Sequence, residues 1–180
     1  MLKYSLPFLL LIHFHGFSQR LKYTPLRAAF TLEGAGTGTT AMFSAETPFY
    51  YRPRTFMNLQ AGIGVNGDPR KKMSESYSVG ITYNLFLNPH RQTECSPFPG
   101  FRNLEYYLEA GVASTFEPGY GTVPNSRYEE TGYNYPGLLG VRFHFVNHRW
   151  IYILKLRYTP LMNCGFASWG GVVLGLGWKN

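Results

Sequence analysis

Gly137 to Tyr158 reads GLLGVRFHFVNHRWIYILKLRY, and the spacing of its apolar residues decides the fold class. Up to Phe145, apolar side chains alternate with glycine, arginine and histidine. The alternation resumes at Trp150, with Lys155 and Arg157 placed between apolar neighbours. A period of two predicts two β-strands, each with one apolar and one polar face.

These two strands are expected to form a hairpin. Asn147-His148 fits a two-residue turn, because asparagine tolerates a positive φ angle. With that turn, Phe143 lies opposite Tyr152 and Leu139 opposite Leu156, so the apolar residues of both strands share one side. In a soluble sheet this side would face a core. In a transmembrane barrel it would face lipid, and the charged side chains would point inward.

The N-terminal residues have the features of a secretory signal peptide. Lys3 precedes an apolar stretch from Leu6 to Phe14, and Gly16-Phe17-Ser18 offers small residues at the −3 and −1 positions of a cleavage site. The apolar stretch is shorter than the roughly 20 residues of a membrane-spanning helix. The sequence therefore predicts export, with residues 1–18 removed and residues 19–180 forming one domain.

Six further segments repeat the alternation, so that the chain is expected to hold eight strands. One long strand with a glycine bulge is the alternative for residues 27–47. Eight antiparallel strands bring both termini to the same side, as in the even-numbered bacterial barrels. The predicted fold class is thus all-β, an eight-stranded antiparallel up-and-down transmembrane barrel. The six segments are Arg27–Gly34, Thr39–Thr47, Thr55–Asn66, Tyr77–Leu87, Leu104–Ala113 and Trp169–Lys179.

Several stretches resemble the small outer-membrane β-barrel proteins of Bacteroidota. The shared features are an acidic-glycine strand (YLEAG within NLEYYLEAGVASTF), an Arg-x-x-x-Thr-Pro-like strand end at 156–161 and the glycine-aromatic strand SWGGVVLGLGW. The segment EGAGTGTTAMFSAE resembles the glycine-rich opening of that family, and the similarity covers most of Ala28 to Trp178. One departure is that Lys179-Asn180 follow Trp178. The resemblance implies the outer membrane as location and the barrel-insertion machinery as a partner, and it brings no known reaction.

The polar faces predict a network of charges inside the barrel. An eight-stranded barrel is just wide enough to be filled by side chains, and an unpaired buried charge costs several kcal/mol. We therefore predict that Glu109 lies within ion-pair distance of Arg142 or Lys155, and that the network plugs the lumen. Open porins need roughly 16 strands. The charged residues expected inside are Glu33, Glu46, Glu105, Glu109, Arg142, His144, Lys155 and Arg157.

A lipid A-modifying hydrolase is the enzymatic alternative, since some small outer-membrane barrels trim lipid A. Ester hydrolysis there would need a serine, a histidine and an acid near the outer rim. Ser114 and Glu117 are expected near that rim, whereas His90, His144 and His148 fall in or near the periplasmic half. We therefore expect no catalytic residues.

The positive charge of the chain points to anionic partners. The formal charge of +7 becomes +6 when Lys3 leaves with the signal peptide. Export argues against nucleic acid, so lipid headgroups or lipopolysaccharide phosphates are the expected partners, and a solvated surface without a partner fits equally well. The candidate loop-binding residues are Arg70, Lys71, Lys72, Tyr120, Tyr128 and Tyr133. The aromatic residues expected to form interfacial girdles are Phe145, Trp150, Tyr152, Tyr158, Trp169 and Trp178.

No cofactor or metal site is expected, because the sequence has no spaced cluster of His, Cys and Asp. Cys95 and Cys164 fall in loops at opposite ends of the barrel, more than about 20 Å apart and beyond disulfide reach. The sequence thus predicts a monomeric outer-membrane barrel with a structural or surface-binding role. A soluble periplasmic ligand-binding barrel of lipocalin type is the other alternative, and it would expose Arg142 and Lys155 to water.

Overall fold

The computed structural model describes residues 23–35, 37, 40–66, 74–87, 103–118, 132–160 and 168–179. The predicted signal peptide lies outside these ranges. Among the residues that are described, no helix is long and apolar enough to cross a membrane. The strands are β1 (Leu26–Gly34), β2 (Ala41–Phe49), β3 (Thr55–Asn66), β4 (Ser74–Phe86), β5 (Leu104–Phe116), β6 (Tyr133–Asn134), β7 (Gly137–Asn147), β8 (Trp150–Pro160) and β9 (Ser168–Lys179).

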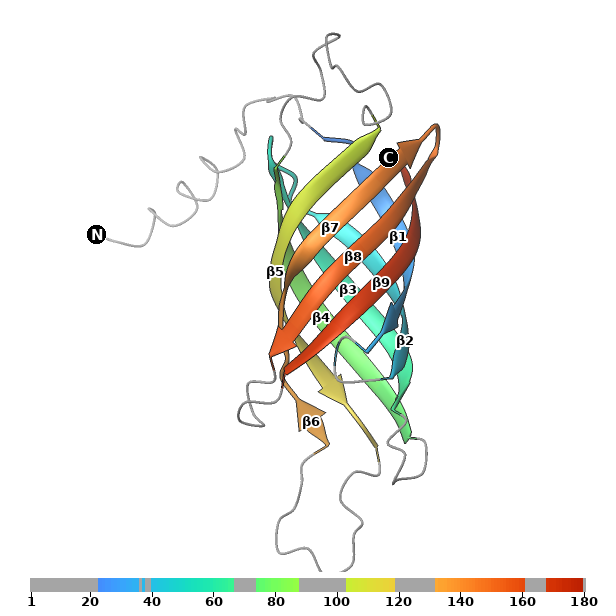
Figure 1. The fold of residues 1–180 in the computed structure, drawn as a ribbon, viewed down its shortest axis with the longest axis vertical. Coiled ribbons are helices and arrows are strands. Elements are labelled where there is room, and N and C mark those ends of the chain that lie inside the picture. The colour runs from blue at the N-terminus through green and yellow to red at the C-terminus, as the bar shows by residue number, and fades with distance from the viewer. Residues whose placement is uncertain are drawn as a thin grey trace, which may run out of the picture.

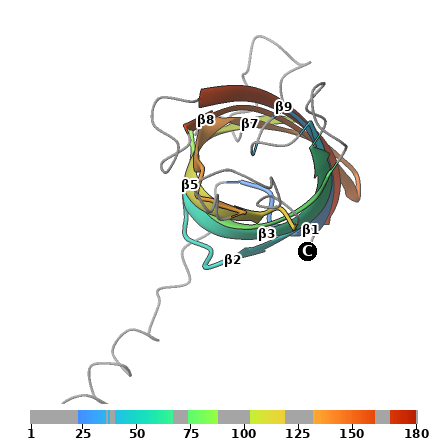
Figure 2. The same cartoon turned by 90° about the horizontal axis from the view of Figure 1, so that it is seen from below.

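These strands close into a barrel (Figures 1 and 2), and the pairings give eight strands in its ring. The order is β4-β3-β2-β1-β9-β8-β7-β5, every pairing is antiparallel, and β4 pairs with β5 to complete the ring. The two-residue strand β6 pairs with the end of β5 and extends the wall beyond the ring (Figure 1). The predicted eight-stranded up-and-down barrel is confirmed.

The two ends of the barrel differ, and we name them by what lies there. At the terminus side, Leu26 of β1 pairs with Lys179 of β9. The loop side is the opposite end, where the chain passes from β1 to β2, from β3 to β4 and from β8 to β9. The chain between Gly34 and Ala41 is a connection on the loop side, so two strands and not one long strand occupy residues 27–47.

The turn of the β7–β8 hairpin lies one residue later than predicted. Asn147 remains in the strand and pairs with Trp150, so that His148 and Arg149 form the turn. His148 takes the positive φ angle, 42°, that the prediction assigned to Asn147. The predicted Asn147-His148 turn is therefore wrong.

The later turn also shifts the hairpin register by two residues. The predicted pairings of Phe143 with Tyr152 and of Leu139 with Leu156 are wrong. Because side chains alternate with a period of two, an even shift leaves every residue on its predicted face. Alternation alone cannot detect such a shift, which depends on where the turn closes. The observed pairs are Phe143–Leu154 and Leu139–Tyr158.

The interior of the barrel holds two apolar clusters toward the terminus side. The aliphatic cluster consists of Leu26, Ala29, Val146, Ile151 and Ile153. The aromatic cluster consists of Tyr23, Phe56, Phe86 and Tyr107, with Tyr51 packed against it. Among the described residues, Met42, Ala113, Leu138 and Val173 are also buried and apolar, and charged side chains occupy the lumen beyond the two clusters.

Candidate functional site, a charge network inside the barrel

Five strands direct charged side chains into the lumen, and each of these side chains is 5% exposed or less. All belong to the inward set of an alternating strand, which is why the sequence could place them. Every charged residue that was expected inside the barrel lies in the lumen. We call the set the lumen charge network: Glu33 on β1, Glu46 on β2, Glu105 and Glu109 on β5, Arg142 and His144 on β7, and Lys155 and Arg157 on β8.

Glu46 lies at the centre of the network. Its Oε2 atom is 3.0 Å from Arg142 Nη1, and its Oε1 atom forms an ion pair with Lys155. Asn58 Nδ2 donates a hydrogen bond of 2.9 Å to Glu46 Oε2. One carboxylate therefore compensates two buried cations, an arrangement in which removal of the acid would leave both bases short of a partner.

Glu109 binds most closely to a base that the sequence had not paired with it. Arg157 Nε donates a hydrogen bond of 2.7 Å to Glu109 Oε1, and Arg157 Nη2 forms an ion pair with the same oxygen at 2.6 Å. The Oε2 atom of Glu109 lies 3.7 Å from Arg142 and 3.6 Å from Lys155. Both of these distances fall within the ion-pair range that was predicted for Glu109. The contact with Arg157 is the stronger one, because it is shorter and includes a charge-assisted hydrogen bond.

Arg157 extends the network across the lumen. Its Nη1 atom lies 3.1 Å from Glu33 Oε2, and its Nη2 atom donates 2.9 Å to Gln60 Oε1. Glu33 belongs to β1 and Gln60 to β3, neither of which neighbours β8 in the ring. These pairs across the barrel axis have no signal in the sequence, since they depend on strand tilt and on side-chain reach.

His144 connects the central charges to the terminus side. Arg142 Nε donates a hydrogen bond of 2.6 Å to His144 Nε2, so that this nitrogen acts as the acceptor and the ring proton lies on Nδ1. His144 Nδ1 is 3.8 Å from Glu105 Oε2. Glu105 and His144 are direct neighbours across β5 and β7, and they form the layer expected nearer the periplasmic end.

The residues before β1 enter the terminus-side mouth of the barrel, and we call Tyr23–Pro25 the strap. Thr24 donates to Glu105 Oε1 twice at 2.8 Å, from its backbone nitrogen and from its hydroxyl. Tyr107 donates 2.6 Å to the other oxygen, Oε2. Glu105 is therefore shared between the strap, the aromatic cluster and His144.

Tyr23 anchors the strap in the aromatic cluster. Its ring centroid lies 5.6 Å from Phe56, 5.9 Å from Phe86 and 6.0 Å from Tyr107. Its hydroxyl donates 2.7 Å to the backbone oxygen of Thr55. Burial raises the pKa of Tyr23 above the usual tyrosine range and that of Tyr51 to about 12. Sequence reasoning missed the strap, because three residues outside any strand carry no periodic signal.

Eight buried polar atoms in the lumen lack a hydrogen-bond partner among the described residues. Four belong to the charge network, and four belong to small polar residues on β3 and β4. Buried polar groups of this kind are the usual partners of internal water. The interior thus suits a hydrated ion-pair plug. The atoms are Glu33 Oε1, Glu109 Oε2, Arg142 Nη2, His144 Nδ1, Asn58 Oδ1, Ser76 Oγ, Ser78 Oγ and Asn84 Oδ1.

The residues of the enzymatic alternative do not come together. Ser114 faces outward on β5 and is half-buried, whereas Glu117 is buried on the inward side. His144 lies in the lumen, His148 lies at the terminus-side turn, and His90 lies outside the described residues. The described part of the chain also holds no group of three or more His, Cys, Asp or Glu that could bind a metal ion.

Most of the candidate loop-binding residues lie outside the described residues, namely Arg70, Lys71, Lys72, Tyr120 and Tyr128, as do Cys95 and Cys164. Tyr133 on β6 is exposed, and its ring centroid lies 4.8 Å from that of Phe116. Four of the expected girdle residues face outward and are about half exposed: Phe145, Trp150 and Tyr152 toward the terminus side and Tyr158 toward the loop side. Trp178 is half-buried, and the side chain of Trp169 is not described.

These features define a class of protein, the small closed β-barrel with an apolar outer face and a lumen filled by charges. No family model and no curated protein matches the sequence. Among solved structures, the N-terminal β-barrel domain of Pseudomonas aeruginosa OprF aligns with a TM-score of 0.52 and 13% identity. That alignment covers 88% of this chain and 100% of the domain.

Two further barrels are similar to this chain. The Yersinia pestis outer membrane protein Ail, in a phospholipid bilayer nanodisc, aligns with a TM-score of 0.51 and 10% identity, over 86% of this chain and 99% of Ail. The outer membrane enzyme PagL has a TM-score of 0.48 and 9% identity, over 84% of this chain and 99% of PagL. At such identities the likeness to OprF and Ail concerns the fold alone, and the likeness to PagL carries no argument about activity.

Proposed function

We propose that this chain is an integral outer-membrane β-barrel protein with a plugged lumen and a structural or surface-binding role. The observation that carries the proposal is the inverted polarity of the wall. Every strand of the ring contributes an outward apolar residue that is between 49% and 61% exposed, while the lumen charge network is buried. The outward residues are Leu32, Phe43, Ile63, Val79, Leu108, Leu139, Leu156 and Leu174.

An apolar belt of this extent needs a solvent other than water. Monomeric soluble proteins rarely expose contiguous apolar patches larger than a few hundred Å², whereas outer-membrane barrels carry an apolar band around their whole circumference. A soluble barrel of lipocalin type would have exposed Arg142 and Lys155, and both are fully buried. The wall therefore supports a lipid environment.

Further features favour the outer membrane and a role other than conduction or hydrolysis. The predicted signal peptide, the resemblance to Bacteroidota barrels and the fold shared with the outer membrane protein Ail support the location. The aromatic cluster and the charge network occupy the lumen, which argues against an open pore. Ser114 and Glu117 lie on opposite faces of the wall, which argues against the hydrolase. Outer-membrane lipid and lipopolysaccharide are the partners we propose, with a monomer as the working state.

Fractionation of the envelope tests this proposal. We expect the full-length protein in the outer-membrane fraction, with faster gel migration before boiling than after it. As a matched pair, Leu174→Arg should reduce insertion by roughly 2–4 kcal/mol, because a cation would face the bilayer, while Leu174→Ala retains the apolar belt. Recovery of wild-type protein in the soluble periplasmic fraction, or equal behaviour of both variants, would contradict the membrane assignment.

A further inference from the structure

Among the described residues, every charged side chain that reaches the surface at the terminus-side rim is basic. Glu75 lies on the loop side at the start of β4, and the other carboxylates that the structure describes are buried. The ion pairs between described residues lie in the lumen. The described part of this rim therefore offers its bases no exposed carboxylate. The bases are Arg27, Arg52, Arg54, Arg149 and Lys179.

Three of these bases lie next to one another, where the start of β1, the end of β9 and the β7–β8 turn meet (Figure 1). Lys179 pairs with Leu26, the residue before Arg27. The backbone nitrogen of Lys179 donates a hydrogen bond of 3.0 Å to the backbone oxygen of Arg149. Neighbouring strands lie about 4.8 Å apart, so long side chains from all three positions can reach one anion. We call Arg27, Arg149 and Lys179 the basic cluster.

A β-bulge contributes Arg27 to the outer face. From Leu26 to Ala28, β1 advances by two residues while β9 advances by one, so that Arg27 is the additional residue. Leu26 and Ala29 are 2% and 1% exposed, whereas Arg27 between them is exposed. Ala28 remains opposite the outward Trp178. The bulge thus adds a base to the outer face and leaves the apolar row beside it intact.

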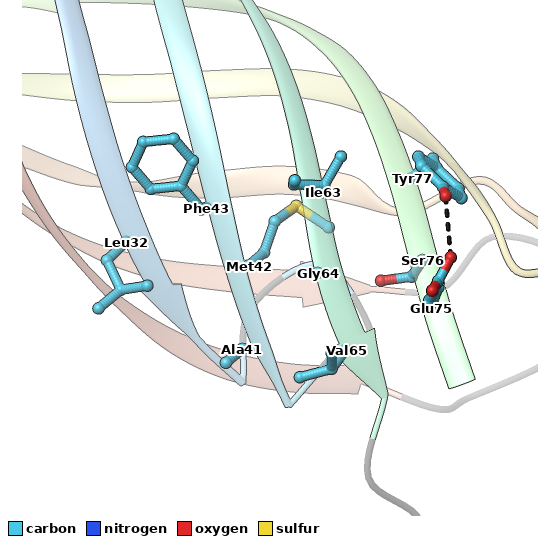
Figure 3. Close-up of a pocket in the computed structure, with 10 residues that line it drawn as sticks. All are labelled: Leu32, Ala41, Met42, Phe43, Ile63, Gly64, Val65, Glu75, Ser76 and Tyr77. Carbon is cyan, nitrogen blue, oxygen red and sulfur yellow. Dashed lines mark hydrogen bonds between the residues drawn. The ribbon is translucent and has the colours of Figure 1, made fainter. Parts of the chain in front are cut away.

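An aromatic strip runs from the basic cluster toward the middle of the outer wall. Trp150 and Trp178 pair with one another across β8 and β9, and each is next in sequence to a base of the cluster. The ring centroid of Trp178 lies 6.0 Å from that of Phe30. Phe30 stacks on Phe43, with centroids 5.8 Å apart and an angle of 12° between the rings. Phe43 pairs with Leu32 in the apolar belt (Figure 3).

Bases at the end of an aromatic wall match an amphiphile with an anionic headgroup. Arginine and lysine bind phosphate oxygens through charge-assisted hydrogen bonds, and tryptophan is enriched at the level of lipid headgroups. A free phosphate ion or an acidic polypeptide would use the bases but leave the strip without a partner. The combination of cluster and strip therefore favours a lipid.

We propose that the basic cluster binds the phosphate of an anionic phospholipid of the phosphatidylglycerol type, and that the aromatic strip contacts its acyl chain. The inference rests on the proposed function, because it takes the outer wall as the lipid-facing surface. It goes further by naming one site and one lipid class. Arg27 and Arg149 hold the phosphate, and Trp178 and Phe30 contact the chain.

A pair of double variants with equal charge tests the site. Arg27→Gln with Arg149→Gln removes two bases of the cluster, and Arg52→Gln with Arg54→Gln removes two bases from the β2–β3 turn at the same rim. Full-length protein in detergent micelles is titrated with phosphatidylglycerol, and bound lipid is counted by native mass spectrometry. We expect the first variant to bind about tenfold more weakly, or about 1.4 kcal/mol, and the second to bind like the wild type. Equal binding by the two variants would overturn the site.

The lipid class is tested with three further ligands. Phosphatidylethanolamine carries an ammonium group that the bases repel, so it should bind more weakly than phosphatidylglycerol and respond little to the cluster variant. Glycerol phosphate and polyglutamate, as soluble competitors, should leave the lipid bound because they cannot contact the strip. Equal binding of phosphatidylethanolamine would overturn the anionic class. Displacement of the lipid by either soluble anion, at an equal concentration of charge, would overturn the lipid assignment.

Failure of this inference can be told apart from failure of the proposed function. Heat-modifiable migration verifies that each variant is folded before lipid is counted. A protein that fractionates with the outer membrane, but whose two double variants bind phosphatidylglycerol equally, would refute the site alone. A protein absent from the membrane fraction would refute the proposed function, whatever the titration shows.

Discussion

The aromatic cluster and the lumen charge network occupy two levels of the lumen and consist of different kinds of side chain. Toward the terminus side, Tyr23, Phe56, Phe86 and Tyr107 pack ring against ring, with the strap entering from outside the barrel. Beyond them, charged side chains from five strands bind one another across the axis. The first level is held together by apolar packing and the second by charge compensation.

This difference teaches where the molecule is most sensitive. In the apolar level the cost of a substitution is graded, since it grows with the volume removed. In a buried ion pair even a change that keeps the size of the side chain is costly, because loss of one partner leaves the other charge uncompensated. Glu105 joins the two levels through Thr24, Tyr107 and His144. Substitutions in the charged level should therefore lower the free energy of unfolding most. Substitutions at the link formed by Glu105 should have a smaller effect, and substitutions in the strap the smallest.

Glu46→Gln should have the largest effect. The change keeps the size of the side chain but leaves Arg142 and Lys155 without their nearest carboxylate. We expect the free energy of unfolding to fall by about 3–5 kcal/mol in a urea titration of protein refolded in micelles. The control is Glu75→Gln at the outer rim, which should stay within about 0.5 kcal/mol of the wild type. Similar losses of stability in both variants would show that a carboxylate in the lumen contributes no more to stability than one on the outer surface.

Tyr107→Phe tests the link between the two levels. The ring stays in the aromatic cluster, and the hydrogen bond of 2.6 Å to Glu105 is lost. Because the acceptor is a buried carboxylate, we expect a loss of roughly 1.5–3 kcal/mol in the same titration. Tyr83→Phe, on the outward face of the neighbouring strand β4 and 46% exposed, should change little. If the two variants are equally stable, the levels are independent of one another.

The strap should give the smallest effect, visible as a dependence on pH. Burial raises the pKa of Tyr23 above its value in the unfolded chain, so the folded state holds the proton more tightly. The stabilisation is complete below pH ~10 and declines as the pH rises further, because only the unfolded chain then ionises. Between pH 8 and pH 11 the wild type should lose at most about 1 kcal/mol more than Tyr23→Phe. An identical loss of unfolding free energy in both proteins would show that ionisation of Tyr23 does not contribute to the pH dependence.

The alternation of residues determined the fold class and the two faces of the wall. It is a local property of each strand, and it survives an error in register, as the β7–β8 hairpin demonstrates. For the same reason it placed Arg142, Lys155 and Glu109 in the lumen. Burial then required that these charges be paired, and this could be predicted without knowing the partners.

Only the tertiary structure decided which partners meet. Glu46 binds Arg142 and Lys155, and Arg157 binds Glu109 and Glu33, because closure and tilt of the strands bring distant positions to one height. The position of Tyr23 in the strap has the same origin, since its ring packs against side chains from β3, β4 and β5. The periodicity of a single strand gives no information about contacts between side chains of different strands.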